Sequence, residues 1–482
     1  MANEERVEAS DTPVGDQVRR ARAAQRSVES WSQQRVDLAV LAAGWAILEP
    51  GRNRELAELA VSDTGVGNVA DKMRKNHRKT LGLLRDLQGA KSVGVIAEDP
   101  QRGLIEIARP VGVVCAVTPS TNPAATPANK IINALKGRNA VIVAPSPKGW
   151  STCARLVEFI HAQLDRVGAP RDLVQLLAPP VNKQATAELM RRCDLVVATG
   201  SQSNVRAAYA SGTPAFGVGA GNVAGIVDET ADVAAAAERI VSSKTFDHAT
   251  SCSSENSLVV VDAAREALLA ELRARGAVLL DAAQKAQLRA LMWPDGRLSE
   301  RVIGQSARVI AERAALLHAD GRSGWARIAE RDPCVLMVEE DGVGPEHPFS
   351  GEKLSPVLAL YGAADFADAV ALVERLYAYQ GAGHSVGLHS TRDERALELG
   401  LTLPVSRVIF NQAHCFATGG SFDNGLPFSL SMGCGTWGRN NFSDNMNYRH
   451  YLNITRVSRR IAERVPDEQE ILGALFREVG RA

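Results

Sequence analysis

The sequence carries no net charge, because its 482 residues include 55 Lys and Arg and 55 Asp and Glu. A basic surface for nucleic acid or for an anionic membrane is therefore not expected. Long apolar runs are also missing: the longest one near the start, residues 38–48, has about half the length that a bilayer crossing needs. The first thirty residues lack the basic and then apolar order of a secretory signal. We expect partners that are small molecules, with no nucleic acid and no membrane among them.

Paired cysteines are missing as well. The seven cysteines are odd in number and include no CxxC pair, which argues against a disulfide framework and against a thiolate zinc site. They are Cys115, Cys153, Cys193, Cys252, Cys334, Cys415 and Cys434. Scattered free cysteines suit a reducing compartment, so we predict a cytoplasmic protein without a metal centre.

Alternating short apolar runs and helical segments fill most of the chain. Apolar residues at helical spacing predict one or two helices within residues 15–48, and from residue 111 strand-like and helix-like segments alternate. The alternation restarts after Gly225 and ends near residues 408–411. Such a pattern is typical of βαβ units, so we predict an α/β fold with two consecutive parallel-sheet domains and a ligand cleft between them.

Three segments have residues suited to chemistry. Cys252 lies among small hydroxyl residues between a helix and a strand, and a cysteine thiolate attacks carbonyls, although a lone cysteine is more often part of a core. The run FGVGAGN (216–222) allows close backbone approach to a ligand or forms a packing turn. It is not a Rossmann fingerprint, because GxGxxG fails at Asn222. Asn122, in TPSTNP after a strand, either donates an N–H to an oxyanion or serves as a turn residue.

Taken together and in this order, six segments resemble the aldehyde dehydrogenase superfamily, and within it the branch that acylates coenzyme A. They are TPSTNPAATPANKIINALK (118–136), ATGSQSNVRAAYASG (198–212), FGVGAGN (216–222), SKTFDHATSCSSENSLVVVD (243–262), GEKLSPVL (351–358) and SMGCGTWGRNNFSDN (431–445). The resemblance runs from about residue 20 to about residue 460. It implies that Cys252 is the nucleophile, that Asn122 meets the oxyanion, and that a nicotinamide cofactor takes the hydride.

The resemblance also implies a cofactor that lies against the first sheet, with Glu352 on the nicotinamide ribose. The residues that it places at the cofactor are Thr118, Pro119, Ser120, Pro145, Ser146, Gly200, Ser201, Gly217, Val218, Gly219, Glu352 and Leu354. NAD users often have a carboxylate on the adenosine ribose. Here that place corresponds to Pro147, with Lys148 next to it, so we predict NADP, with NAD as the alternative.

One departure from the superfamily pattern bears on the acyl acceptor. Hydrolytic members have a glutamate that activates water where this chain has Gly217. Loss of a general base costs water attack on the order of 10²–10⁴-fold, whereas a thiol is intrinsically the better nucleophile. We therefore predict that coenzyme A takes the acyl group. His384 lies where the acylating branch also has a histidine, and it either assists proton transfer or packs in the core.

Within the branch, KGWSTCA (148–154), DHATSCSSENS (247–257) and the run 411–438 are most similar to members that oxidise sulfoacetaldehyde. A sulfonate needs donors and a cation, and the candidates are Lys244, His414, Thr418 and Arg439. Alternatively these residues order a loop, and the substrate is acetaldehyde or another short aldehyde. A hydrolytic dehydrogenase and a non-catalytic binding protein remain as further alternatives.

The resemblance also assigns the domains. Residues 1–225 are predicted to bind the cofactor, residues 226–425 to form the catalytic domain that carries Cys252, and residues 426–482 to form a C-terminal return and oligomerisation arm. Residues 101–109 and 452–461 are predicted strands that pair across subunits, so we expect a homodimer or a homotetramer.

Overall fold

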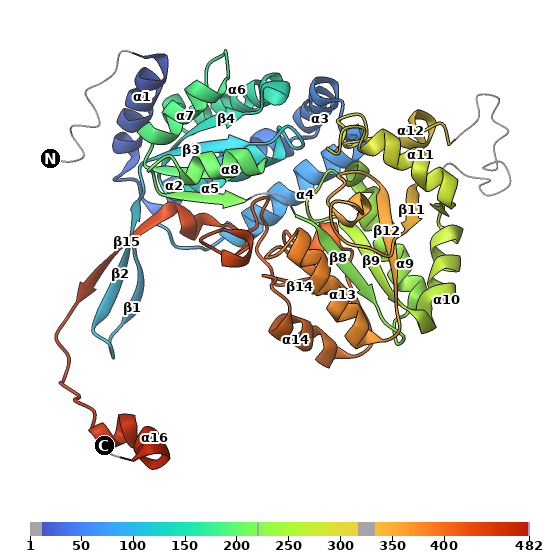
Figure 1. Cartoon of the computed structure of the whole chain (residues 1–482). Coiled ribbons are helices and arrows are strands. Elements are labelled where there is room, and N and C mark those ends of the chain that lie inside the picture. Colours follow the sequence, from blue (N-terminus) through green and yellow to red (C-terminus); the bar gives the residue numbers. More distant parts are fainter. Residues whose placement is uncertain (1–11, 219–220, 317–332, 481–482) are drawn as a thin grey trace.

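The computed structural model describes residues 12–218, 221–316 and 333–480. Two parallel sheets form the body of the molecule, and a narrow arm extends away from it (Figure 1). The predicted α/β class with two consecutive parallel sheets is confirmed, because every pair of neighbouring strands in both sheets is parallel.

The first sheet has the strand order β5-β4-β3-β6-β7. Its strands are β3 (Val113–Thr118), β4 (Ala140–Pro145), β5 (Val174–Leu176), β6 (Leu195–Thr199) and β7 (Ala215–Val218). The helices between them are α5 (Ala125–Lys136), α6 (Trp150–Arg166), α7 (Lys183–Arg192) and α8 (Gln202–Tyr209). All residues of β3 and β4 are buried, as expected for β-branched and small residues in a sheet covered on both faces.

Four helices precede this sheet: α1 (Pro13–Val28), α2 (Gln33–Leu48), α3 (Pro50–Thr64) and α4 (Val69–Leu87). The first two fall in the range predicted to be helical, whereas α3 and α4 were not predicted. Asn68 caps α4 by accepting a hydrogen bond from the N–H of Asp71. Helix α4 runs from the first sheet toward the second, so its side chains reach the region between them (Figure 1).

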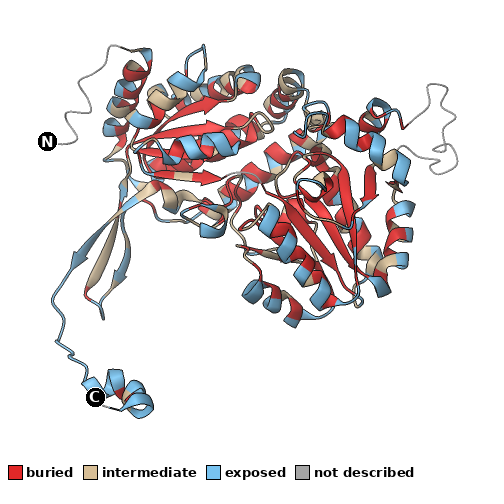
Figure 2. Cartoon of the chain, viewed as in Figure 1, coloured by how far each residue is buried: buried red, intermediate tan, exposed pale blue. Residues whose placement is uncertain are grey.

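The second sheet has the order β10-β11-β12-β9-β8-β13-β14. Its strands are β8 (Val223–Val227), β9 (Glu255–Val261), β10 (Ala277–Leu279), β11 (Val335–Glu339), β12 (Val357–Ala363), β13 (Val386–His389) and β14 (Val408–Phe410). Its helices are α9 (Val233–Thr245), α10 (Asp262–Ala274), α11 (Ala282–Met292), α12 (Ala307–Arg313), α13 (Phe366–Tyr379), α14 (Asp393–Thr402) and the short α15 (His414–Ala417). Strand β9 is buried along its whole length and β12 everywhere except at Gly362 (Figure 2).

After β14 the chain returns to the first sheet. Ser431 shares a hydrogen bond with Thr199, and the amide of Asn441 donates to the carbonyl of Ala215. Phe428 packs directly on Gly82 of α4, where any side chain would overlap its ring. This return segment therefore packs against both the first sheet and helix α4.

The arm consists of β1 (Gly94–Asp99), β2 (Leu104–Pro110) and β15 (Leu452–Ser458), joined as an antiparallel sheet. The two segments predicted to pair across subunits thus pair with each other within one chain. The chain then extends to α16 (Glu468–Val479), which lies away from the body and is largely exposed (Figure 2). The described residues include no helix long and apolar enough to span a membrane.

Candidate active site

The nucleophile candidate lies on a tightly wound loop between α9 and β9. Asp247, His248 and Ala249 all have left-handed backbone angles, with φ of 50°, 52° and 56°. Such angles are unfavourable for residues other than glycine and persist only where the surroundings enforce them. Here the buried Asp247 accepts hydrogen bonds from Lys72, 3.2 Å away, and from the hydroxyl of Thr250 at 2.9 Å. These hydrogen bonds hold the strained backbone that leads to Cys252 in place.

Cys252 is surrounded by groups that disfavour its thiolate. Burial, and next the carboxylate of Glu352, raise the pKa of the Cys252 thiol to about 12. Arg407 opposes this shift and lowers the pKa. A Cβ at Gly221 would lie 2.5 Å from the carbonyl oxygen of Cys252 and 2.9 Å from Cδ2 of His384. The lack of a side chain at Gly221 therefore allows the segments that carry Gly221, Cys252 and His384 to pack closely together.

His384 has an unused ring nitrogen beside this loop. Its Nδ1 is 2.7 Å from the hydroxyl of Ser385, and its buried Nε2 has no hydrogen-bond partner in the part of the chain that the structure describes. Burial, reinforced by the charge of Arg407, lowers the pKa of His384 to about 3, so the ring is neutral at physiological pH. The neutral ring has one N–H and one acceptor nitrogen, and a pKa this low makes it a weak base.

Asn122 is oriented by a residue that the sequence analysis did not find. Lys75 of α4 donates a hydrogen bond of 2.9 Å to Oδ1 of Asn122, and a second one, of 2.5 Å, to Asp247. Because the amide oxygen is engaged, the amide nitrogen is directed away from Lys75. Asn122 and Ser251 line the same pocket, so the amide lies beside the loop that carries Cys252.

A large groove runs along the carboxyl ends of the first sheet's strands, where ligands of parallel sheets bind. It encloses about 1330 Å³ of empty space, part of it open to solvent. The predicted cofactor residues that line it are Thr118, Pro145 and Ser146. The hydroxyl of Thr118 is buried and has no partner within the described residues. The other lining residues include no carboxylate, and Asn182 and Lys183 add polar groups. These features fit a phosphate-bearing dinucleotide.

The remaining cofactor candidates lie around this groove or between the sheets. Gly200 has φ of 146° and adjoins Pro119, and Ser201 caps α8 by accepting from the N–H of Asn204. Ser120 is partly exposed after β3, and Val218 ends β7. Gly219 lies outside the described residues.

Glu352 and Leu354 approach from the second sheet. The N–H of Gly221 lies 3.4 Å from a carboxylate oxygen of Glu352. Burial raises the pKa of Glu352 to about 8, and this N–H and the charge of Lys244 act in the opposite direction. Leu354 has φ of 44° and its carbonyl accepts from the N–H of Gly304. Glu352 thus lies close to Cys252 rather than in the groove along the first sheet.

Gly217 leaves no room for the glutamate of hydrolytic enzymes. A Cβ at this position would lie 2.6 Å from Cγ1 of Val205 and 3.0 Å from the ring of Tyr209. The hydroxyl of Tyr209 also accepts a hydrogen bond of 3.1 Å from the N–H of Gly217. The space beside this backbone is therefore filled by two side chains of α8.

Of the four candidates for sulfonate binding, three are buried and one is exposed. Lys244 is fully buried, and its ammonium has no hydrogen-bond partner among the described residues. Burial lowers the pKa of Lys244 to about 7, against the charges of Glu255 and Glu352. His414 shares a hydrogen bond with Ser385. The hydroxyl of Thr418 donates to the carbonyl of His414, and Arg439 is exposed.

A second hollow instead opens beside Asn122, on the side of α4. It is lined by Lys75, Arg78, Lys79, Asn122, Phe246, Ser251, Cys415, Phe416 and Leu430. None of the four predicted substrate residues lines it. The signal for it in the sequence is the spacing of Lys75, Arg78 and Lys79, which places three cations on one face of a helix.

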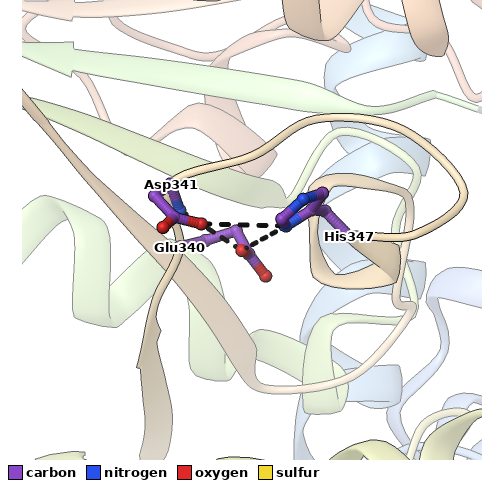
Figure 3. A group of neighbouring side chains, drawn as sticks. All are labelled: Glu340, Asp341 and His347. Carbon is purple, nitrogen blue, oxygen red and sulfur yellow. Dashed lines mark hydrogen bonds and ion pairs between the residues drawn. The ribbon is translucent and has the colours of Figure 1, made fainter.

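One group of metal-ligand types occurs within the described ranges, at the end of β11. Ligand atoms of Glu340, Asp341 and His347 lie within 4.8 Å of one another (Figure 3). The buried carboxylate of Glu340 is already 2.9 Å from Nδ1 of His347 and 3.2 Å from the ammonium of Lys285. These two partners account for its burial without an ion.

The described fold agrees with known proteins. The model of the aldehyde dehydrogenase family matches residues 5–428, and the chain belongs to this family. A sulfoacetaldehyde dehydrogenase (acylating) of Cupriavidus necator is 64% identical over 475 residues, 98% of this chain and 94% of the relative. Another, of Bilophila wadsworthia, is 40% identical over 97% of this chain and 99% of its own length. The crystal structure of an acetylating aldehyde dehydrogenase from Geobacillus thermoglucosidasius is 35% identical, with a TM-score of 0.87, covering 97% of this chain and 100% of that one. The resemblance seen in the sequence motifs is confirmed.

Proposed function

We propose that this chain is a CoA-acylating dehydrogenase that oxidises sulfoacetaldehyde to sulfoacetyl-CoA, with NADP or NAD as hydride acceptor. The observation that carries the acylating assignment is Gly217, where Val205 and Tyr209 fill the space that a water-activating glutamate needs. The choice of sulfoacetaldehyde as substrate is supported by the two sulfoacetaldehyde dehydrogenases described above, which match almost the whole chain.

In the proposed reaction, the sulfur of Cys252 adds to the aldehyde carbon. The thiol proton is relayed toward solvent by way of His384, whose neutral ring lies beside the Cys252 loop and whose Nε2 has no partner among the described residues; with a pKa of about 3 the ring passes the proton on and does not retain it. The amide nitrogen of Asn122, oriented by Lys75, donates a hydrogen bond to the developing oxyanion. When bound, the nicotinamide supplies the hydride acceptor, and the acyl group then remains on Cys252 as a thioester.

The second half of the reaction transfers the acyl group to sulfur rather than to water. The thiol of coenzyme A attacks the thioester, and Cys252 leaves as a thiolate that regains its proton. Burial of Cys252 favours the neutral thiol, because the low-polarity surroundings disfavour the charged form. His384 is therefore proposed to move the proton in both halves.

The groove along the first sheet is proposed to hold the dinucleotide. Thr118, Pro145 and Ser146 line it, and Glu352 holds the nicotinamide ribose once the cofactor reaches the space between the sheets. A preference for NADP is supported by the lack of a carboxylate among the residues that line the groove and by the nearby Lys183.

The hydrolytic alternative has one specific observation in its favour, since Glu352 is a half-buried carboxylic acid close to Cys252 with its pKa raised to about 8. One assay separates the possibilities. Reduction of NAD or NADP is followed with sulfoacetaldehyde, acetaldehyde or succinic semialdehyde, with and without coenzyme A. The proposal expects sulfoacetaldehyde with coenzyme A to be the best pair. Full turnover without coenzyme A would establish the hydrolytic alternative, and sulfoacetaldehyde as the poorest substrate would overturn the substrate assignment.

A homodimer or homotetramer is supported by the arm. Ile471 and Leu475 of α16 are 63% and 52% exposed, and Val465 before it is 77% exposed. Apolar side chains at that density on an extended tail are typical of a surface that a second subunit covers. A cytoplasmic location is supported by the seven cysteines, all of which are free.

A further inference from the structure

The hollow beside Asn122 has an unusual balance of charge. Three of its nine lining residues are cations, Lys75, Arg78 and Lys79, and none of the nine is a carboxylate. The rest of the wall is formed by the apolar side chains of Phe246, Phe416 and Leu430, with Cys415. The enclosed space of the hollow is small, about 30 Å³, and it opens to solvent. Asn122 and Ser251 are among its lining residues, so the hollow adjoins the loop that carries Cys252.

Lys75 is not the cation that an anionic substrate would meet. Its ammonium is within 2.5 Å of the Asp247 carboxylate and also bonds Asn122 and Thr250. These partners use its three donor positions. With its three donors taken, Lys75 has none left for an anion, which would be bound by the other two cations.

Arg78 has an unused donor. Its Nε is buried and has no hydrogen-bond partner within the described part of the chain. One terminal nitrogen donates to the hydroxyl of Ser421. The guanidinium lies over the rings of Phe416 and Phe422, 5.5 and 5.3 Å from their centroids. Aromatic contacts of this kind fix the side chain, so the donors are oriented before a ligand arrives.

Lys79 is buried with its charge uncompensated. Its ammonium donates to the carbonyls of Gly419 and Gly420, at 2.7 and 3.2 Å, and no carboxylate forms an ion pair with it among the described residues. Burial, and next the charge of Arg78, lower the pKa of Lys79 to about 7. An anion placed between the two cations would remove their mutual repulsion and restore the charged form of Lys79.

We propose that Arg78, supported by Lys79, binds the sulfonate of the substrate in this hollow and selects anionic aldehydes over neutral ones. The proposal rests on the proposed function, for which it names the residues that determine substrate specificity. A sulfonate offers three oxygens to the guanidinium, whose planar donors suit an oxyanion. A neutral aldehyde of the same size leaves Nε of Arg78 without an acceptor and Lys79 without a counter-charge, and sites built around polar partners reject such analogues strongly.

The test compares sulfoacetaldehyde with propionaldehyde, a neutral aldehyde of similar size, in the holoenzyme with coenzyme A. Arg78→Met is expected to lower kcat/KM for sulfoacetaldehyde about 30-fold or more, mainly through KM, with a loss for propionaldehyde at least tenfold smaller. For Arg78→Lys, kcat/KM for sulfoacetaldehyde should lie between the values of the unaltered enzyme and Arg78→Met, because lysine keeps the positive charge but lacks the planar guanidinium donors. Arg85→Met is the matched control: Arg85 lies on the same helix, over Phe422 and Phe428, but does not line the hollow.

A second readout does not depend on turnover of the sulfonated aldehyde. Ethanesulfonate should inhibit propionaldehyde oxidation competitively in the unaltered enzyme and in Arg85→Met, and at least tenfold more weakly in Arg78→Met. Equal losses for both aldehydes in Arg78→Met, with an unchanged inhibition constant, would overturn the subsite. If the unaltered enzyme prefers propionaldehyde while ethanesulfonate still depends on Arg78, the proposed substrate fails and the anion subsite stands. Thermal unfolding of each variant identifies any that fails to fold.

Discussion

The ammonium of Lys75 lies 2.9 Å from Oδ1 of Asn122, so a helix preceding the first sheet orients the amide proposed to meet the oxyanion. The same ammonium is held by Asp247, on the loop that leads to Cys252. One buried cation therefore links the proposed oxyanion donor to the loop of the nucleophile.

Substitution of Lys75 or Asn122 should lower kcat more than it raises KM. Removal of an oxyanion donor costs about 10²–10³-fold in kcat, so Asn122→Ala is expected to lose that much. Lys75→Met should lower kcat by about 10- to 100-fold with little change in KM, because it leaves the amide present but free to turn. The double variant should lose little more than Asn122→Ala alone, since the two residues act through one interaction. Initial-rate measurements check all three.

Lys72→Met is the matched control for this prediction. Lys72 also bonds Asp247, at 3.2 Å, but its second partner is the carbonyl of Thr121 rather than the side chain of Asn122. If Lys72→Met and Lys75→Met reduce kcat equally, the role of Lys75 is to support the loop and the orientation of Asn122 is not its function.

The reactivity of Cys252 toward iodoacetamide should depend steeply on pH. Because the thiol pKa is raised to about 12, the thiolate fraction in the enzyme without cofactor should rise about tenfold per pH unit from pH 7 to pH 10. The sign follows from deprotonation, since only the thiolate reacts and pH approaches the pKa from below. Mass spectrometry of the labelled peptide gives the rate, with Cys252→Ser as the blank. A plateau below pH 8 would contradict the raised pKa.

Restoring a glutamate at position 217 should not create a hydrolase. The new Cβ would lie 2.6 Å from Val205, so Gly217→Glu and even Gly217→Ala should lower the free energy of unfolding by about 1–3 kcal/mol. Denaturant titrations measure this loss, and nicotinamide reduction without coenzyme A measures hydrolysis. A stable Gly217→Glu variant that turns over without coenzyme A would show that the missing side chain alone decides the acyl acceptor.

The apolar face of α16 should stabilise the oligomer. Leu475→Asp is expected to reduce the mass measured by size exclusion with light scattering, because it places a charge among side chains that we propose a second subunit covers. Arg477→Asp is a control on the same helix, at an exposed polar position. A monomeric unaltered protein, or equal masses for both variants and the unaltered chain, would refute the role of the tail.

The fold could be predicted because its buried strands appear in the sequence as short runs of apolar residues. Residues 111–117 were predicted as a strand, and β3 spans Val113–Thr118. Helix α4 was missed because part of its buried face carries Lys72, Lys75, Asn76 and Lys79, so polar and charged residues occupy positions where a core helix is expected to be apolar. The charges on that face are tolerated only because Asp247 and backbone carbonyls, far along the chain, meet them.

The same reason limited prediction of the site. Lys244 and Arg439 are the cations within the recognised motifs. Lys244 is fully buried, whereas Arg439 is exposed on the surface. Arg78 reaches the hollow through a helix that no motif marks. The motifs around Cys252 therefore did not indicate the cations that line the hollow.

The most direct test of the account is the amount of reduced nicotinamide formed when the enzyme meets sulfoacetaldehyde without coenzyme A. A thioester on Cys252 that water attacks poorly predicts a rapid burst of about one equivalent per active chain, followed by almost no turnover. Adding coenzyme A should then start steady turnover, and Cys252→Ser should show neither phase. Continued turnover at the initial rate without coenzyme A, or a burst in Cys252→Ser, would contradict the account.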